Sequence, residues 1–588
     1  MSGATVRVLD PTGKVIATGR PVSATTGAYG PVPLVGQGPF RVEACGSVGD
    51  KPLCVWGATN DGGTLNLTPL TSAITVLASG QSPETLMTGA AQGLTNEAVA
   101  SAHAQLRTAL APALADAGLA SDFDLLAGAL TPGLHTGHDR VLDAVAVALG
   151  FDTKAFVTLS SRLGAGTAYL EPGTTQGSFS IDAAAGPVDL IGLDALFASM
   201  NTAMASNASC QPGLTAVFDA NVRASLDPST TFSGGQAAQV ICLRLGGVLG
   251  DGEVLFGGKL LPTTLGRCDF DAGDPVCRVN FVFQNSKGYQ RRLGQEQVAV
   301  KRPTGWAFLG NRLEVQASAS ARLVLVRRVD AAAPDSYARY LDISIPAVGV
   351  SGGDTLQCAR VSQKDSGGAD VALALFKRGG GGMLSLWSVS SNDATPSLDP
   401  ATGATRGANV IALQVPTGAA GDTTVRNFAR AGRALKIELY GDAACATPLT
   451  GADGPAISVE LPGLLPIAAS SHSGQPWPAL ATASATALAS LKGTANAKVS
   501  YGPSWTFPRR DLAVNRAQLC TDTACNGKLA ELELTAGATT AAFTPTLGTT
   551  ALATSDYKLL RITGRMPDGL VLQLDSQSCA GQVASLPC

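Results

Sequence analysis

The sequence is poor in charge and in histidine. Only 15% of its 588 residues are Asp, Glu, Lys or Arg, the formal net charge is -3, and there are 4 histidines. Such a small net charge gives no bulk attraction to nucleic acid or to an anionic membrane, so neither is expected as a partner. With so few histidines, structural zinc is also a poor explanation of the cysteines.

Long apolar runs and aromatic side chains are scarce as well. Hydrophobic residues make up 45% of the chain, but the longest apolar stretch, VLDAVAVALGF, is much shorter than the about 20 residues of a membrane-spanning helix. We therefore expect no transmembrane segment. Aromatics at 5% argue against a broad sugar-stacking surface, which leaves Trp387, Trp477 and Trp505 as isolated anchors for a ligand.

Cysteine is the most informative residue that is present, with 12 copies, an even number. Short spacings between neighbours indicate local disulfides rather than metal sites, which need clustered Cys and His. Connectivity does not follow from sequence alone. The expected pairs are Cys45/Cys54, Cys210/Cys242, Cys268/Cys277, Cys358/Cys445, Cys520/Cys525 and Cys579/Cys588.

Six disulfides imply an oxidising compartment, so we expect a secreted, cell-surface or periplasmic protein. The opening MSGATVRVLDPTGK has neither a basic n-region nor an apolar h-region. We therefore expect an export signal to have been processed off or trimmed before Met1.

The first sixty or so residues predict a small β-sandwich. ATVRVLD and KVIATG read as strands on either side of a Pro11-Thr12-Gly13 turn, and PFRVEACG follows a Gly/Pro loop. TVRVLDPTGKVIATG, with TTGAYGPVPL and FRVEA, resembles the carboxypeptidase regulatory-like (prealbumin-like) modules of many bacterial surface proteins. This resemblance implies an accessory module without catalytic function.

From Thr68 the hydrophobic period changes from two to about 3.6 residues. Thr68-Pro69 and Ser82-Pro83 each place a cap residue before a proline at the first helical position, and Thr136 to Asp139 has capping-box spacing. Residues 68–150 are predicted to be a helical bundle. Its apolar faces are marked by Val99, Leu106, Leu110 and Leu114, and by Leu142, Val145 and Leu149.

The third predicted unit combines helices with long strands. VDLIGLDALFASMNTAMA reads as a helix, and an antiparallel meander then runs to KRPTGWAFLGN. This order, with Gly305, Trp306, Gly310 and Asn311 in its last strand, resembles the cone fold of nuclear transport factor 2-like and ketosteroid-isomerase-like domains. The resemblance implies a concave pocket, in which Asp194, Asp219, Asp251 and Tyr289 are the candidate acid and base groups.

From about residue 333 the chain is predicted to be β throughout, with strands such as YLDISIP and ALKIELYG between Gly/Thr/Asp-rich turns. The expected fold class is therefore multidomain and mainly β, with α and α+β parts. The predicted organisation is 1–66 β-sandwich, 67–158 helical bundle, 159–186 linker, 187–328 α+β cone, 329–455 β-sandwich and 456–588 C-terminal β-sandwich.

The stretch CDFDAGDPVC, residues 268–277, has two interpretations. Its Asp, Gly and Pro residues are ordinary turn formers, so Cys268 and Cys277 are expected to staple the tip of a hairpin. Alternatively, Asp269, Asp271 and Asp274 supply oxygens to calcium, although the Gly and the distant Glu of an EF-hand loop are absent. Apart from this calcium site, no cofactor is expected.

Other motifs favour structure over chemistry. GVSGG has the spacing of a nucleophile elbow at Ser351, but the residues after it predict a strand rather than the required helix, and His472 is the only downstream histidine. His135 and His138 have metal-ligand spacing, but Gly137 and the cap position of Thr136 favour a loop and first helical turn.

Two functions stay open at this point. The first is a non-catalytic, exported surface protein that binds a surface, polymer or small-molecule ligand, or that builds the cell exterior. The second is an extracellular enzyme, of isomerase, lyase or hydrolase type, whose site lies in the cone pocket. The absence of a recognisable catalytic constellation favours the first.

Overall fold

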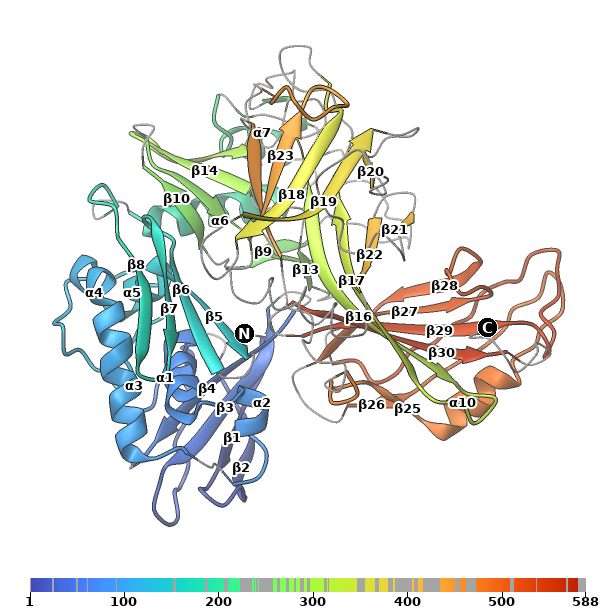
Figure 1. The fold of residues 1–588 in the computed structure, drawn as a ribbon, viewed down its shortest axis with the longest axis horizontal. Helices are drawn as coiled ribbons and strands as arrows, with labels where there is room; N and C mark the ends of the chain where they lie inside the picture. Colours follow the sequence, from blue (N-terminus) through green and yellow to red (C-terminus); the bar gives the residue numbers. More distant parts are fainter. Residues whose placement is uncertain are drawn as a thin grey trace. The chain divides into compact units, whose positions relative to one another are not determined.

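The computed structural model is mainly β, with several separate sheets and a smaller helical part (Figure 1). It divides into two compact units, residues 1–49 with 53–313 and residues 50–52 with 314–588. Among the described residues, no helix is both long and apolar enough to cross a membrane. The structure describes all residues except 1, 24–25, 49–50, 61, 91–92, 152–154, 186–188, 206–209, 221, 223–234, 237, 240–241, 243–256, 262–264, 271–273, 280–281, 286–289, 293–296, 311–314, 316, 346–354, 365–369, 379–383, 387–403, 407–410, 416–433, 450–454, 462–471, 508–511, 536, 567–568 and 580–588.

The chain begins with one four-stranded sheet, in the order β2-β1-β3-β4. Its strands are β1 (Ser2–Leu9), β2 (Val15–Pro21), β3 (Phe40–Val48) and β4 (Lys51–Thr59). Alternation along β3 turns Phe40, Val42 and Ala44 to one face, which carries an apolar cluster. The opposite face is also covered, because Arg41 of β3 points to it and donates to the Leu86 carbonyl oxygen of helix α2 (Pro83–Leu86). Helix α1 (Pro69–Ser79) lies at the β4 edge, where Thr71 Oγ1 donates to the Trp56 carbonyl oxygen (2.8 Å) and the Trp56 N–H donates to Ser72 Oγ (2.9 Å). The expected second sheet of a sandwich is thus replaced by a helix and loops.

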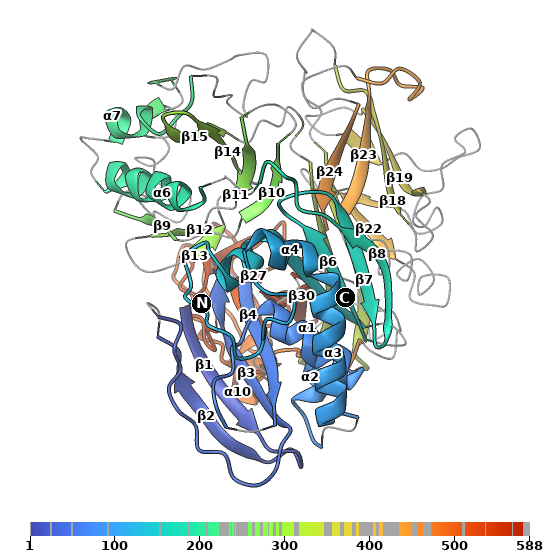
Figure 2. The same ribbon diagram turned by 90° about the vertical axis from the view of Figure 1, so that its left-hand side faces the viewer.

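Two helices begin directly after the capping residues that the sequence predicts. Thr68 caps α1 in a capping box and Ser82 caps α2 (Pro83–Leu86), each with proline at the start of the helix. Helix α3 (Asn96–Ala109) lies beside α1 (Figure 2), and the remaining helices of this group are α4 (Ala111–Asp116) and α5 (His138–Ala144). Thr136 is not the cap of α5, contrary to the spacing, because Gly137 occupies that position without a side-chain bond.

The predicted helical face through Val145 and Leu149 is wrong. Helix α5 ends at Ala144, and a four-stranded antiparallel sheet follows in sequence order. Its strands are β5 (Val145–Phe151), β6 (Ala155–Ser161), β7 (Gly166–Glu171) and β8 (Thr174–Phe179). A short all-apolar run satisfies the helical and the strand period equally, and pairing with β6 decides in favour of the strand. The same sheet occupies most of residues 159–186, which were expected to be a linker.

The rest of the first unit combines two helices and two small sheets. Helices α6 (Ile191–Met204) and α7 (Cys210–Thr215) contact each other. One sheet has the order β10-β11-β14-β15 and the other β13-β12-β9. Their strands are β9 (Lys259–Leu261), β10 (Leu265–Asp269), β11 (Val276–Val279), β12 (Val282–Gln284), β13 (Gln290–Arg292), β14 (Gln297–Arg302) and β15 (Gly305–Gly310).

The second unit contains an eight-stranded sheet in the order β21-β22-β17-β16-β30-β29-β27-β28. Its strands are β16 (Ser318–Arg328), β17 (Ser336–Ser344), β21 (Ala404–Arg406), β22 (Ile411–Val415), β27 (Ala513–Cys520), β28 (Lys528–Glu533), β29 (Lys558–Arg565) and β30 (Val571–Ser578). The parallel pair β16·β30 joins early and late strands. Strand pairing therefore crosses the domain boundary predicted near residue 455.

A five-stranded antiparallel sheet, in the order β20-β19-β18-β23-β24, shares one apolar core with the larger sheet. Its strands are β18 (Cys358–Lys364), β19 (Asp370–Arg378), β20 (Leu384–Leu386), β23 (Ala434–Tyr440) and β24 (Ala456–Glu460). The short strands β25 (Ala479–Leu480) and β26 (Trp505–Thr506) pair with each other. Between them lies helix α10 (Thr482–Ala489), so the expectation of β structure throughout is wrong there, where alanine gives high helix propensity.

Five of the six expected cysteine pairs are disulfides, namely Cys45–Cys54, Cys210–Cys242, Cys268–Cys277, Cys358–Cys445 and Cys520–Cys525. Cys579 is also disulfide-bonded, and its expected partner Cys588 lies outside the described residues.

Candidate functional site

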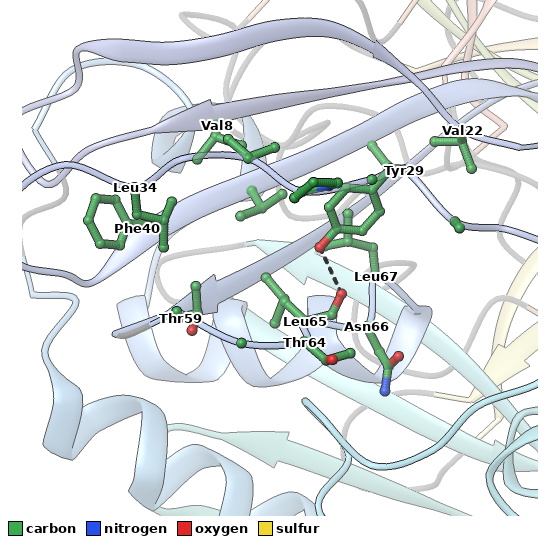
Figure 3. Close-up of a pocket in the computed structure, with 18 of the residues that line it drawn as sticks. Val8, Val22, Tyr29, Leu34, Phe40, Thr59, Thr64, Leu65, Asn66 and Leu67 are labelled. Carbon is green, nitrogen blue, oxygen red and sulfur yellow. Dashed lines mark hydrogen bonds between the residues drawn. The ribbon is translucent and has the colours of Figure 1, made fainter.

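A broad cleft opens on the apolar face of the N-terminal sheet, with a volume of about 1270 Å³ (Figure 3). Its floor is formed by side chains from one face of β1 and β3, including Val8, Phe40 and Val42. One wall is the Gly/Pro-rich loop 22–38, and the other is the segment 59–67. The cleft thus lies on a sheet face and between two loops, the kind of concave site that ligands use.

Tyr29 is the main aromatic group in the walls. Its hydroxyl donates to the Leu65 carbonyl oxygen at 2.9 Å, so the side chain reaches from loop 22–38 to the opposite wall (Figure 3). Burial raises the pKa of this phenol above its usual value, which keeps it neutral at physiological pH. The ring is half-buried, and the bond to Leu65 holds its hydroxyl end.

The two walls approach each other closely where Gly38 meets Asn60. A side-chain carbon at Gly38 would stand only 2.5 Å from the Asn60 carbonyl oxygen. Only glycine fits there, because any larger residue would displace the backbone of the facing wall.

The described residues that line the cleft carry no charge. None of its described residues is an Asp, Glu, Lys, Arg or His; Asp61, in the segment 59–67, lies outside the described residues. Its polar groups are instead hydroxyls and side-chain amides, together with backbone at several glycines. The polar side chains are Ser23, Thr26, Gln37, Thr59, Asn60, Thr64, Asn66 and Asn96. Such a lining can donate and accept hydrogen bonds, but it offers no general base near neutral pH.

Sequence reasoning placed the pocket in the cone segment and missed this cleft. The signal was nevertheless present, because residues 22–38 contain seventeen positions without one charged residue, interrupted by glycines and prolines. Trp477 and Trp505, expected as isolated ligand anchors, are buried, being 7% and 2% exposed. Trp387 lies outside the described residues.

A second polar cluster surrounds His135, in the loop before α5. Its Nδ1 lies 2.8 Å from Asp143 Oδ2, and its Nε2 lies 3.2 Å from Asp194 Oδ2 on α6. Its backbone N–H donates to Asp139 Oδ2 at 2.8 Å. Hydrogen bonds that the ring donates to both carboxylates raise the pKa of His135 to about 9, with the bond to Asp143 as the largest cause.

The distances among His135, Asp139 and Asp143 are short enough for one metal ion. However, an imidazolium with a proton on each ring nitrogen has no lone pair for a metal, and both nitrogens face carboxylates here. The cluster is therefore an ion-paired link between the loop, α5 and α6. His138 does not join it, since its ring packs edge-on against Phe123.

The loop of residues 268–277 is a stapled hairpin. Cys268 and Cys277 face each other across β10 and β11 and are bonded. Asp274, one of the three candidate calcium ligands, accepts a hydrogen bond from Arg302 Nη1 at 2.6 Å. The same guanidinium donates two further hydrogen bonds to the carboxylate of Asp219. Asp269 is exposed, and Asp271 lies outside the described residues. Arg302 thus already neutralises one carboxylate that the calcium interpretation needs.

The other candidate catalytic residues do not assemble into a site in the described part of the chain. Asp194 pairs with His135 and Asp219 with Arg302, in different places. Asp251, Tyr289 and Ser351 lie outside the described residues. His472 is 2% exposed and contacts Tyr337 and Trp477.

Comparisons with known proteins give little beyond this geometry. No family model matches the chain, and no curated protein matches its sequence. One solved structure with some similarity is a DUF3823 family protein from Parabacteroides merdae, at 7% identity over 44% of this chain and 98% of that one, with a TM-score of 0.13. Another is a 1.5-MDa bacterial ice-binding adhesin, at 10% identity over 52% of this chain and 73% of that one, also with a TM-score of 0.13. TM-scores this low do not define a shared fold.

Proposed function

We propose that this chain is an exported, non-catalytic binding protein whose ligand site is the cleft on the N-terminal sheet. The observation that carries the proposal is the chemistry of the lining. The cleft has the size of a ligand site, and its described walls contain hydrogen-bonding groups and an aromatic ring. They contain no ionisable side chain other than the phenol of Tyr29, whose hydroxyl already donates a hydrogen bond to the Leu65 carbonyl oxygen.

Binding is favoured over catalysis because acid–base and nucleophilic mechanisms need a group that can gain or lose a proton near neutral pH. The serine and threonine hydroxyls of the cleft have no described histidine or carboxylate in the lining to activate them. The ionisable pairs elsewhere, such as Asp219 with Arg302, are neutralised internally. Export is supported by the disulfides, which persist in oxidising compartments.

The test is a ligand screen with a variant that fills the cleft. Thr64 is exposed and lines the wall, so Thr64→Trp places a large side chain at the cleft without burying a new polar group. The matched control is Thr18→Trp, at an exposed position of β2 outside the lining. Parent and both variants are screened for ligands by their shift in melting temperature, since a ligand stabilises the state that binds it.

We expect at least one ligand that stabilises the parent and Thr18→Trp but fails to stabilise Thr64→Trp. Ligands that stabilise all three proteins equally would place the binding site elsewhere. Turnover of a bound compound that disappears in Thr64→Trp would contradict the non-catalytic assignment.

A further inference from the structure

The lining of the cleft also indicates which ligands it accepts. Resting on the function proposed above, we infer that the cleft binds a neutral oligosaccharide. The ligand stacks on Tyr29 and is held by uncharged hydroxyl and amide groups of both walls.

The described lining disfavours ionic ligands. A phosphate, sulfate, carboxylate or ammonium group loses hydration on entering a cleft and needs a charged partner or several aligned donors in return. Among the described lining residues no side chain supplies such a charge. Neutral hydroxyl groups, in contrast, exchange their hydrogen bonds with water for bonds to amides and hydroxyls at little loss of free energy.

The walls match the two kinds of surface that a sugar presents. A pyranose ring has apolar C–H faces and a rim of hydroxyl groups. Tyr29 offers an aromatic face whose orientation is fixed by the bond to the Leu65 carbonyl, and aromatic faces pack well on apolar ligand surfaces. Elsewhere in the lining, the exposed Gln37, Thr64 and Asn96 side chains can donate to and accept from the hydroxyl rim.

The position of the cleft argues against a peptide that binds as an added strand. Such a peptide needs a free sheet edge, where backbone groups are available. The floor of this cleft is instead the side-chain face of β1 and β3, two strands paired to each other, and β1 is also paired to β2. The volume of about 1270 Å³ also exceeds the roughly 300–1,000 Å³ of typical small-ligand pockets. It thus offers room for several sugar units.

The experiment measures affinity for neutral oligosaccharides, for anionic oligosaccharides of the same length and for uncharged peptides. The proteins are the parent, Tyr29→Phe and Tyr29→Leu. We expect the parent to bind a neutral oligosaccharide with a Kd that changes less than about twofold between about 50 mM and about 500 mM salt, because screening acts only on charges. We expect the same Kd at about pH 6 and about pH 9, because the described lining has no group that titrates in that range.

The Tyr29 variants separate stacking from structure. Tyr29→Phe keeps the ring and removes the bond to Leu65, so it should bind within about threefold of the parent, and its change in melting temperature measures the structural loss alone. Tyr29→Leu removes the ring and should weaken binding about tenfold or more, which corresponds to about 1.4 kcal/mol.

Three outcomes would contradict the inference in whole or in part, and they are distinguishable. If an anionic oligosaccharide or a peptide binds in the cleft and Thr64→Trp abolishes that binding, the ligand class is wrong while the proposed binding function stands. If no compound binds in a way that Thr64→Trp abolishes, the proposed function itself fails. A neutral oligosaccharide that binds Tyr29→Leu as tightly as the parent would contradict the stacking role.

Discussion

At the scale of single residues, charged side chains link neighbouring elements of the described structure. His135 connects α5 and α6 through Asp143 and Asp194, and Arg302 connects Asp219 to the stapled loop at Asp274. Arg41 is 0% exposed and donates to the carbonyl oxygens of Leu86 and Asp10. The sequence analysis named several of these residues but not their pairings, because most of the pairings join residues far apart in the chain.

The His135 link predicts a specific dependence of stability on pH. Its pKa in the folded protein, about 9, lies above the value near 6.5 of a free histidine. The stabilisation is therefore fully present below about pH 6.5 and is lost as pH rises through about 9. His135→Gln should lower the melting temperature at about pH 6, and the gap to the parent should close at about pH 10.

The control for this prediction is His103→Gln, because burial lowers the pKa of His103 instead of raising it. Its effect on the melting temperature should not vanish as pH rises above 9. A gap between the parent and His135→Gln that stays constant from about pH 6 to about pH 10 would show that folding does not raise the pKa of His135.

Arg41 makes a prediction about folding stability. Replacing it with methionine keeps much of the side-chain volume but leaves the carbonyl oxygens of Leu86 and Asp10 without their donor. We expect Arg41→Met to lower the free energy of unfolding by about 2–4 kcal/mol, measured by urea unfolding. Arg20→Met, at an exposed position of β2, should change it by less than about 0.5 kcal/mol. Equal effects of the two substitutions would contradict the structural role of Arg41.

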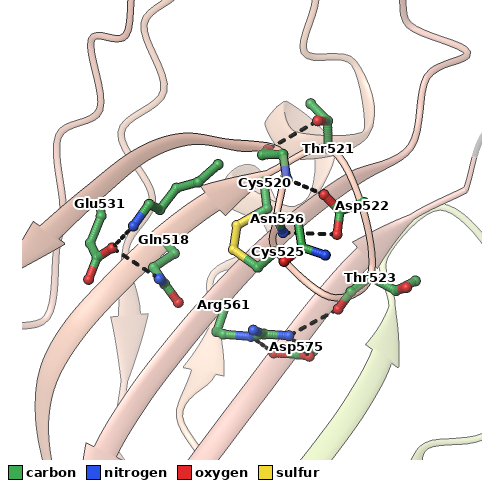
Figure 4. The surroundings of a disulfide bond; sticks show 12 residues. Gln518, Cys520, Thr521, Asp522, Thr523, Cys525, Asn526, Glu531, Arg561 and Asp575 are labelled. Atoms are coloured by element: carbon green, nitrogen blue, oxygen red, sulfur yellow. Dashed lines mark hydrogen bonds and ion pairs between the residues drawn. A yellow bond between two sulfur atoms is a disulfide. The ribbon is translucent and has the colours of Figure 1, made fainter. Parts of the chain in front are cut away.

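At the scale of elements, two hairpins of the second unit share one turn design. Asp442 and Asp522 each begin an Asp-x-Ala-Cys sequence, and each carboxylate accepts backbone N–H bonds from residues four and five positions later. In both turns the cysteine has a positive φ, 58° at Cys445 and 61° at Cys525, and is disulfide-bonded. Figure 4 shows the turn at Cys520–Cys525, with the Thr523 carbonyl accepting from Arg561.

The shared turn predicts that its two aspartates stop stabilising the fold in acid. Backbone N–H bonds lower the pKa of both carboxyls below the usual 3.8. The stabilisation is therefore present above that value and is lost as pH falls through the lower, folded pKa. Asp442→Ala and Asp522→Ala should each lower the melting temperature at about pH 7, and the difference from the parent should shrink towards about pH 2. A difference that persists undiminished in acid would contradict the role of the charged carboxylates.

Some elements could be predicted from sequence and others could not, for physical reasons. The capped helices and the disulfide neighbours depend on local chemistry, so Thr68 and Cys45/Cys54 were assigned correctly. The run around Val145 is apolar throughout, and only pairing with β6 makes it a strand. The cleft was missed because it joins residues 22–38 to residues 59–67, and no local period encodes that approach.

At the scale of the whole molecule, covalent links stabilise a chain that has few charges. The disulfides are distributed over both units, and the hairpins of Cys45–Cys54, Cys268–Cys277 and Cys520–Cys525 are each closed by one. Such links reduce the conformational freedom of the unfolded chain, by an amount that grows with loop length. In the second unit, the parallel pair β16·β30 adds a long-range connection between strands.

This arrangement predicts that the native protein has no free thiol. Thiol counting on the denatured, unreduced protein should find fewer than about one thiol for the 12 cysteines of the chain. The same count after reduction should find all of them and serves as the control. Two or more free thiols before reduction would contradict both the pairing and the oxidising compartment.

The central claim is that the cleft on the N-terminal sheet binds a neutral ligand. Hydrogen–deuterium exchange of the full chain, with and without a saturating neutral oligosaccharide, tests it most directly because it locates the protected backbone. The account predicts slower exchange in residues 22–38 and 59–67, the two walls of the cleft, in the parent but not in Thr64→Trp. Protection confined to other segments, or unchanged exchange at saturation, would contradict it.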